Sequence, residues 1–157
     1  MGVPPGRMRS HARSLGFTLI ELVVVIVIMG LIVRAVAPNF SRTLRVARVN
    51  RASQVLSGDL ERAFALAARQ RKPVRITWDN GAMQYTVKDR LSGTVLMTRG
   101  LGTANSAFNV LVVTFSSSPF DIYPSGLASS ALTVTLTELD YSRRVQLTRA
   151  GLTLVGP

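Results

Sequence analysis

A run of apolar residues with almost no charge occupies the N-terminal part of the chain. Residues 17 to 33, FTLIELVVVIVIMGLIV, contain Glu21 as their only ionisable side chain, and extension to Ala37 adds Arg34 and gives 21 residues. A helix of that length rises roughly 31 Å, about the thickness of one hydrocarbon core. The segment predicts a membrane-spanning helix, and the rest of the 157-residue chain suits one modest domain.

The residues before this run are basic. The stretch RMRSHAR at 7 to 13 precedes the apolar segment, and the positive-inside rule keeps residues 1 to 15 in the cytoplasm. Its three arginines are part of the net charge of +11, and the remaining sixteen basic against eight acidic residues leave +8. A charge of that size suits acidic partners such as nucleic acid or anionic lipid.

The composition argues against an enzyme. The chain has no cysteine, and its one histidine is His11, in the basic stretch. These facts exclude a disulfide framework, a thiolate metal site and a cysteine nucleophile. Without residues 1 to 16, a Ser-His-Asp triad and a His-ligated zinc site are excluded as well. Lys72 and Lys88 lie in no recognisable motif, and we predict no catalytic residues, no metal and no cofactor.

Glu21 is the anomaly in the apolar run. A carboxylate at the bilayer centre costs about 2.5–3.5 kcal/mol, so it either lies near the interface or has a cationic partner. A cut between Gly16 and Phe17 would create an α-amino group four residues from Glu21. Pairing with that amine, in the same helix or in a neighbouring copy, would drive helix association in a medium where hydrophobicity does not.

These residues resemble the type IV pilin and type II secretion pseudopilin class, which has a basic leader ending in Gly, then Phe-Thr-Leu-Ile-Glu and an apolar run. The resemblance implies that prepilin peptidase in the inner membrane cuts between Gly16 and Phe17 and that Phe17 is then N-methylated. It implies that Glu21, the fifth mature residue, acts in filament assembly. Gly30 and Pro38 match positions between which the helix loosens in filaments of the class, as Gly and Pro favour.

An ordinary secretory signal peptide is the main alternative for this segment. AVA at 35 to 37 fits the small-residue cleavage pattern. However, cleavage there would place Pro38 directly after the cut, Arg34 lies within the supposed cleavage region, and Glu21 stays unexplained.

The next segment has a helical period. Pro73 ends it, because the residue before a proline is disfavoured in a helix, and a single helix over 17 to 72 would measure roughly 84 Å. Its second half, 38 to 72, is amphipathic. The apolar positions are Phe40, Leu44, Val49, Ala52, Leu56, Leu60, Ala63 and Ala67.

Arginines fill much of the remaining helix surface, and two interpretations stay open for them. They form either a solvated face that can lie near anionic lipid, or contacts with acidic surfaces of neighbouring subunits or of another partner. Asp59 is expected to pair with Arg62 at a spacing of three residues. The arginines are Arg42, Arg45, Arg48, Arg51, Arg62 and Arg69.

Residues 73 to 157 have the period of strands. Alternating apolar residues predict seven short strands: 74–79, 83–88, 94–98, 110–115, 131–139, 143–148 and 152–155. Asn-Gly at 80 to 81 and Arg-Ala-Gly at 149 to 151 mark hairpin turns, and 116 to 130 is expected to be a loop. The predicted fold is α+β, with a long N-terminal helix on antiparallel sheets whose core includes Trp78, Tyr85 and Phe115. The expected divisions are 1–16 leader, 17–37 membrane half of the helix, 38–72 amphipathic half and 73–157 β domain.

Two stretches narrow the resemblance to the GspH/FimT-like minor pseudopilins. DIYPSGLASSALTVTL is similar to an aromatic-x-Pro-x-Gly stretch before a strand, at Tyr123, Pro124 and Gly126. RRVQLTRAGLTLV is similar to the terminal hairpin of that family, with Gly151 at its centre. Ser125 differs from the acidic or amide residue that family members often have at this position. The alternative explanation of the Pro and Gly residues is that they only form turns, as they do in any β domain.

Absent features favour a minor subunit. Major pilins often close a C-terminal loop with a disulfide, and this chain has no cysteine. Major pseudopilins often bind calcium, but Asp121, Glu138 and Asp140 lack calcium-ligand spacing. The tip subunit of the secretion pseudopilus typically lacks the glutamate that this chain has at Glu21.

Two functions are therefore expected as alternatives. The first is a minor pseudopilin of a type II secretion system, anchored in the inner membrane with its β domain in the periplasm, then incorporated near the tip of a pseudopilus. Its partners would be prepilin peptidase, other pseudopilin subunits and secreted cargo. The second is a FimT-like minor pilin that binds DNA for uptake through Arg143, Arg144 and Arg149, although GLTLVGP lacks the extra basic residues of DNA-binding members.

Overall fold

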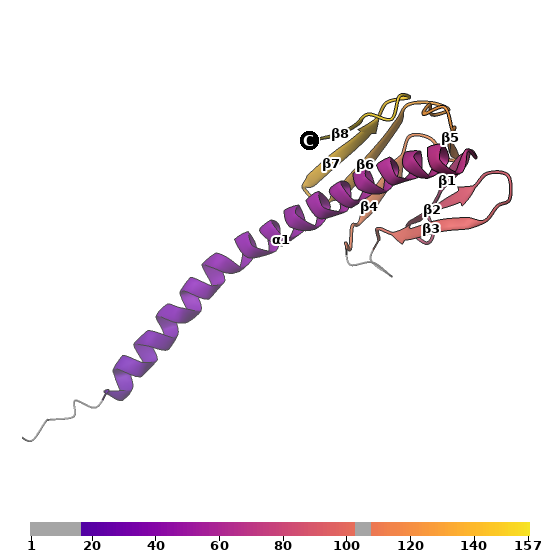
Figure 1. Cartoon of the computed structure of the whole chain (residues 1–157). Coiled ribbons are helices and arrows are strands. Elements are labelled where there is room, and N and C mark those ends of the chain that lie inside the picture. The colour runs from indigo at the N-terminus through magenta and orange to yellow at the C-terminus, as the bar shows by residue number, and fades with distance from the viewer. Residues whose placement is uncertain (1–16, 103–107) are drawn as a thin grey trace, which may run out of the picture. The chain divides into compact units, whose positions relative to one another are not determined.

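The computed structural model describes residues 17–102 and 108–157, apart from the side chains of 36–38. The basic leader, including Gly16, lies outside the described residues. The chain forms two compact units, one up to Asn39 and one from Phe40 to Pro157. One helix, α1 (Leu19–Gln70), runs through both units, and all strands belong to the second (Figure 1).

Helix α1 starts and stops within two residues of the predicted ends. At its start, the backbone N–H of Glu21 donates to Thr18 Oγ1 at 3.3 Å, so Thr18 is the N-cap. At its end, Arg71 adopts a left-handed backbone (φ 52°) two residues before Pro73. The helix is continuous through positions 30 and 38, and loosening there remains a prediction for the filament.

Two four-stranded antiparallel sheets form the rest of the second unit. The first has the order β3-β2-β1-β5 and the second β4-β6-β7-β8. Both contact α1 through side chains, and Figure 1 shows the β2–β3 and β7–β8 hairpins beside its second half. The strands are β1 (Val74–Asp79), β2 (Gln84–Asp89), β3 (Val95–Gly100), β4 (Val112–Phe115), β5 (Phe120–Ile122), β6 (Leu132–Glu138), β7 (Tyr141–Leu147) and β8 (Thr153–Gly156).

The predicted apolar stripe of the helix lies in the core. From Val49 to Ala67 its members are at most 1% exposed, whereas Phe40 and Leu44 are exposed. Tyr85 is fully buried, and Trp78 stacks on Phe115 with ring centroids 4.7 Å apart. The predicted α+β architecture is confirmed.

One strand was not predicted. β5 lies inside the expected loop at 116 to 130 and pairs with β1, so that Arg75 is opposite Asp121. Arg75 donates two hydrogen bonds to Asp121, at 2.7 and 2.9 Å. These bonds hold the pKa of the Asp121 carboxyl below its usual range. An ion pair therefore fixes the edge strand that completes the first sheet.

The expected pair of Asp59 with Arg62 is wrong. Asp59 is buried, accepts a hydrogen bond from the Tyr85 hydroxyl of β2, and pairs with Arg99 of β3 through both carboxylate oxygens. Its side chain faces the first sheet, whereas Arg62 is exposed. Burial, followed by the hydrogen bond to Asp59, raises the pKa of Tyr85 and keeps its hydroxyl protonated.

Gly151 in the β7–β8 turn is required for two reasons. Its φ is +84°, and a Cβ there would lie 3.1 Å from the ring of Phe64 on α1. A side chain would therefore meet both the steric penalty of left-handed backbone and the aromatic ring. This contact places the turn against the helix.

We expect Gly151→Ala to destabilise the second unit by about 2–3 kcal/mol, the left-handed backbone costing about 1–2 and the ring contact about 1. Gly93→Ala is the matched control, because Gly93 has φ +72° and a Cβ added there would meet no atom within 4 Å. Denaturant unfolding followed by the fluorescence of Trp78, the single tryptophan, measures both. Equal losses for the two variants would contradict a role for the Phe64 contact.

Candidate functional site

The N-terminal part of α1 has its apolar side chains uncovered. Every large apolar side chain from Phe17 to Val33 is at least 45% exposed. Among the described residues, α1 is the one helix long and apolar enough to cross a membrane, and none of its most apolar stretch is buried. Such a surface needs lipid or other apolar helices around it.

Glu21 lies in the first turn of this helix, where a negative charge favours the helix dipole. Thr18 and Glu21 have the spacing of a capping box, and the Thr18 oxygen accepts the backbone N–H of Glu21. Thr18 was not among the predicted site residues, although Thr-x-x-Glu before an apolar run is a signal for it. Phe17 precedes the helix and is 81% exposed, with Glu21 four residues further on.

Three of the helix arginines pair within the chain. Arg42 and Arg45 approach Asp140 at 3.4 and 3.8 Å, and Arg48 approaches Glu138 at 3.5 Å. Glu138 is the last residue of β6, and Asp140 lies in the β6–β7 turn. Neither of the two interpretations of these arginines covered this arrangement, in which they hold a hairpin to their own helix.

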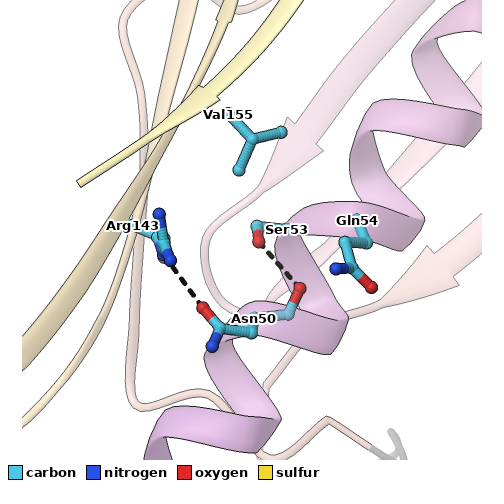
Figure 2. A pocket seen from close by; sticks show the side chains of 5 residues that line it. All are labelled: Asn50, Ser53, Gln54, Arg143 and Val155. Atoms are coloured by element: carbon cyan, nitrogen blue, oxygen red, sulfur yellow. Dashed lines mark hydrogen bonds between the residues drawn. The ribbon is translucent and has the colours of Figure 1, made fainter.

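A polar pocket of about 290 Å³ opens between α1 and the second sheet. Its lining residues are Asn50, Ser53, Gln54, Arg143 and Val155 (Figure 2). Arg143 Nε donates to Asn50 Oδ1 at 2.9 Å, while its other end points away from Asn50. The Tyr141 hydroxyl donates to the same oxygen at 2.9 Å. The pocket is therefore lined by a fixed guanidinium, two amides, a hydroxyl and one apolar side chain.

The three arginines predicted as a DNA contact do not share one face. Arg143 and Arg144 are consecutive in β7, so their side chains point to opposite faces of the sheet. Arg143 faces the helix and is half-buried, Arg144 is exposed on the other face, and Arg149 is exposed in the β7–β8 turn. The two-residue period of a strand could have been applied to the sequence, and it would have placed Arg143 and Arg144 on opposite faces.

The two stretches that carried the narrower resemblance lie side by side. The Tyr123–Gly126 turn is closed by the Gly126 N–H donating to the Tyr123 carbonyl at 3.1 Å, and Gly126 has φ +79°. The N–H of Ala128 then donates to the Arg149 carbonyl in the β7–β8 turn at 2.8 Å. Across the described residues, no group of three or more His, Cys, Asp or Glu side chains is placed to hold a metal ion.

Comparisons with known proteins agree with this geometry. The family model described as the prokaryotic N-terminal methylation motif matches residues 11–33. The model described as type II transport protein GspH matches residues 52–151. No curated protein matches the chain significantly.

Two solved structures share the fold. The type IV minor pilin FimU of Pseudomonas aeruginosa has a TM-score of 0.56 at 16% identity, over 69% of this chain and 88% of FimU. The minor pseudopilin EpsH from the Type 2 Secretion System of Vibrio cholerae has a TM-score of 0.52 at 13% identity, over 69% of this chain and 96% of EpsH.

Fold and motif together define a protein of the type IV pilin and pseudopilin class. Within that class, the chain belongs to the type II transport protein GspH family.

Proposed function

We propose that this chain is a minor pseudopilin of a type II secretion system, a structural subunit that enters a periplasmic filament near its tip, helps to initiate assembly and promotes protein export. The observation that carries the proposal is the methylation motif at 11–33 and the GspH match at 52–151 on one chain. The similarity of fold to EpsH supports the same function.

The N-terminal residues have defined roles in this proposal. Prepilin peptidase cuts between Gly16 and Phe17, and the new amine of Phe17 is methylated. Glu21 pairs with the Phe17 amine of a neighbouring subunit, which satisfies a carboxylate that is costly in lipid. Gly30 and Pro38 let the helix loosen when the subunit packs in the filament.

The apolar segment also sets the expected location. It anchors the chain in the inner membrane as a single span, with residues 1 to 15 cytoplasmic and the β domain periplasmic. Other pseudopilin subunits then replace lipid around the uncovered apolar side chains. Secreted cargo contacts the β domain.

A FimT-like minor pilin that binds DNA for uptake is the second candidate. The similarity of fold to the minor pilin FimU supports it, as does the excess of basic residues. Such binding should weaken steeply with salt, and loss of any one arginine in contact with phosphate should reduce that slope by about one. Because Arg143 and Arg144 lie on opposite sheet faces, one DNA surface cannot use both.

The first test is the mass and N-terminal residue of the protein purified from its native membrane. We expect a chain that starts at N-methylated Phe17. A chain that starts at Pro38 would fit signal peptidase instead, and an intact Met1 beside active prepilin peptidase would contradict processing. Either result would overturn the pseudopilin assignment.

A further inference from the structure

The second unit carries more positive charge than its own acids neutralise. Five acidic residues of 40–157 form seven ion pairs, and each pair takes a different basic residue. The two other acids, Glu61 and Asp79, are outnumbered by eight basic residues that have no ion pair among the described residues of this unit. Three of the eight, Arg143, Arg144 and Arg149, lie on β7 and the turn that follows it.

Strand β8 is the outer strand beside β7, and its free edge is poorly protected. Although the strand is only four residues long, which itself limits pairing, the stretch GLTLVGP that includes it has no charged side chain, and no proline lies inside the strand. Leu152, Leu154 and Val155 are 60%, 52% and 41% exposed. Edge strands that must not pair usually carry charges, bulges or covering loops.

The register of β8 shows which backbone groups face outward. The Thr148 N–H donates to the Leu152 carbonyl, and Gln146 lies opposite Leu154. Hydrogen-bonded and non-hydrogen-bonded pairs alternate in an antiparallel ladder, so Leu154 bonds toward β7 while the N–H and C=O of Thr153 and Val155 point to the free edge. An added strand would find its backbone partners there.

The polar pocket lies beside this edge. Val155 lines it together with Asn50, Ser53 and Gln54 of α1 and with Arg143 of β7 (Figure 2). Directly opposite residues of neighbouring strands point to the same face. A residue paired opposite Val155 would therefore extend its side chain into the pocket, and its neighbours along the strand would lie beside the exposed Leu154.

We propose that the free edge of β8 binds an extended segment of a partner protein, with an acidic side chain in the Arg143 pocket and apolar residues on either side of it. Backbone pairing supplies affinity, and the pocket supplies selectivity. Arg143 fits a carboxylate because its Nε is bound to Asn50 and Tyr141 while its terminal nitrogens keep further N–H donors. The amides of Asn50 and Gln54 add N–H donors around the same space, whereas the hydroxyl of Ser53 donates to the Asn50 carbonyl at 2.8 Å.

This inference goes beyond filament assembly and does not depend on it. The edge and the pocket belong to the 40–157 unit, whereas assembly is assigned to Phe17 and Glu21 of the apolar segment. A protein segment fits better than nucleic acid, because Arg144 lies on the other sheet face and cannot join Arg143 in one contact, and because β8 itself has no charged side chain.

The test uses the full chain in detergent micelles and a fluorescein-labelled peptide of about nine residues, a length typical of longer strands. The peptide alternates Thr and Val and has Glu at its centre. Two matched peptides carry central Gln, or N-methyl groups on the backbone nitrogens of the Glu and of the residues two positions to either side, which face β8 in an antiparallel pairing. The protein variants are Arg143→Gln and Arg144→Gln, which remove the same charge from opposite faces of β7, and thermal unfolding verifies that both fold.

We expect the Glu peptide to bind, and the Gln and N-methylated peptides to bind at least tenfold more weakly. Arg143→Gln should weaken the binding of the Glu peptide at least tenfold, whereas Arg144→Gln should not. Absence of binding would overturn the proposal. Equal losses for the two arginine variants would also overturn it, because they would indicate unspecific charge attraction. So would displacement of the peptide by double-stranded DNA with the same dependence on Arg143, which would assign the pocket to nucleic acid.

Discussion

Replacing Asp59 by asparagine is expected to lower the free energy of unfolding of the 40–157 unit by about 2–4 kcal/mol. The carboxylate is buried and joins α1 to β2 through Tyr85 and to β3 through Arg99. Its removal leaves the Arg99 guanidinium without its ion partner in a mostly covered position. The side chain of Arg99 is 35% exposed, so water softens a loss that would otherwise be larger.

Urea unfolding of the full chain in detergent, followed by Trp78 fluorescence, measures this loss. Glu61→Gln is the control, because Glu61 is exposed on the same helix and has no ion pair among the described residues, and its change should stay within about 0.5 kcal/mol. Tyr85→Phe removes one hydrogen bond while the ion pair stays, and should cost about 1 kcal/mol. A loss for Asp59→Asn no larger than that for Glu61→Gln would contradict a stabilising role for the buried pair.

Replacing Glu21 by valine is expected to reduce incorporation of the subunit into filaments at least tenfold, a change worth about 1.4 kcal/mol or more. Valine suits lipid better than glutamate does, so the subunit should still insert in the membrane. What is lost is the only carboxylate of the apolar segment, and with it the proposed partner for the Phe17 amine of a neighbour. The measurement is the amount of chain in filaments isolated from the periplasm relative to the amount in the membrane.

Thr18→Ala separates this role from helix capping. It removes the oxygen that accepts the Glu21 N–H, at a cost of about 1 kcal/mol, and leaves the carboxylate in place. We expect the Thr18→Ala variant to be incorporated into filaments nearly normally, and the Glu21→Asp variant to keep part of the incorporation of the unchanged chain. If Thr18→Ala and Glu21→Val reduce incorporation equally, incorporation depends on the structure of the first helical turn and does not depend on the charge of Glu21.

The long helix and the strand pattern were predictable because both depend on local signals. The apolar positions from Val49 to Ala67 repeat at helical spacing, and all of them are buried. In β6, alternation of Leu132, Val134 and Leu136 with threonines predicted the face that packs inward. The motif ending at Glu21 likewise predicted the family, which the comparisons confirm.

Contacts between distant residues could not be predicted in this way. β5 is three residues long and lies among serines and prolines, and only its pairing with β1 makes it a strand. Asp59 has a basic residue three positions away, but its partner Arg99 is forty residues further along the chain. Likewise, the helix arginines form ion pairs with Glu138 and Asp140 in a hairpin about ninety residues later, and no local spacing indicates these pairs.

For the proposed periplasmic location of the β domain, the order of the strands along the chain has a consequence for folding during export. The apolar face of α1 between Val49 and Ala67 is synthesised early, whereas the strands β6 to β8, from Leu132 to Gly156, would be the last part of the chain to be exported. Until they arrive, that apolar face stays partly uncovered, a state prone to aggregation during translocation. A folding helper that shields the emerging helix would therefore act before the second sheet exists, and slowing export should increase the need for it.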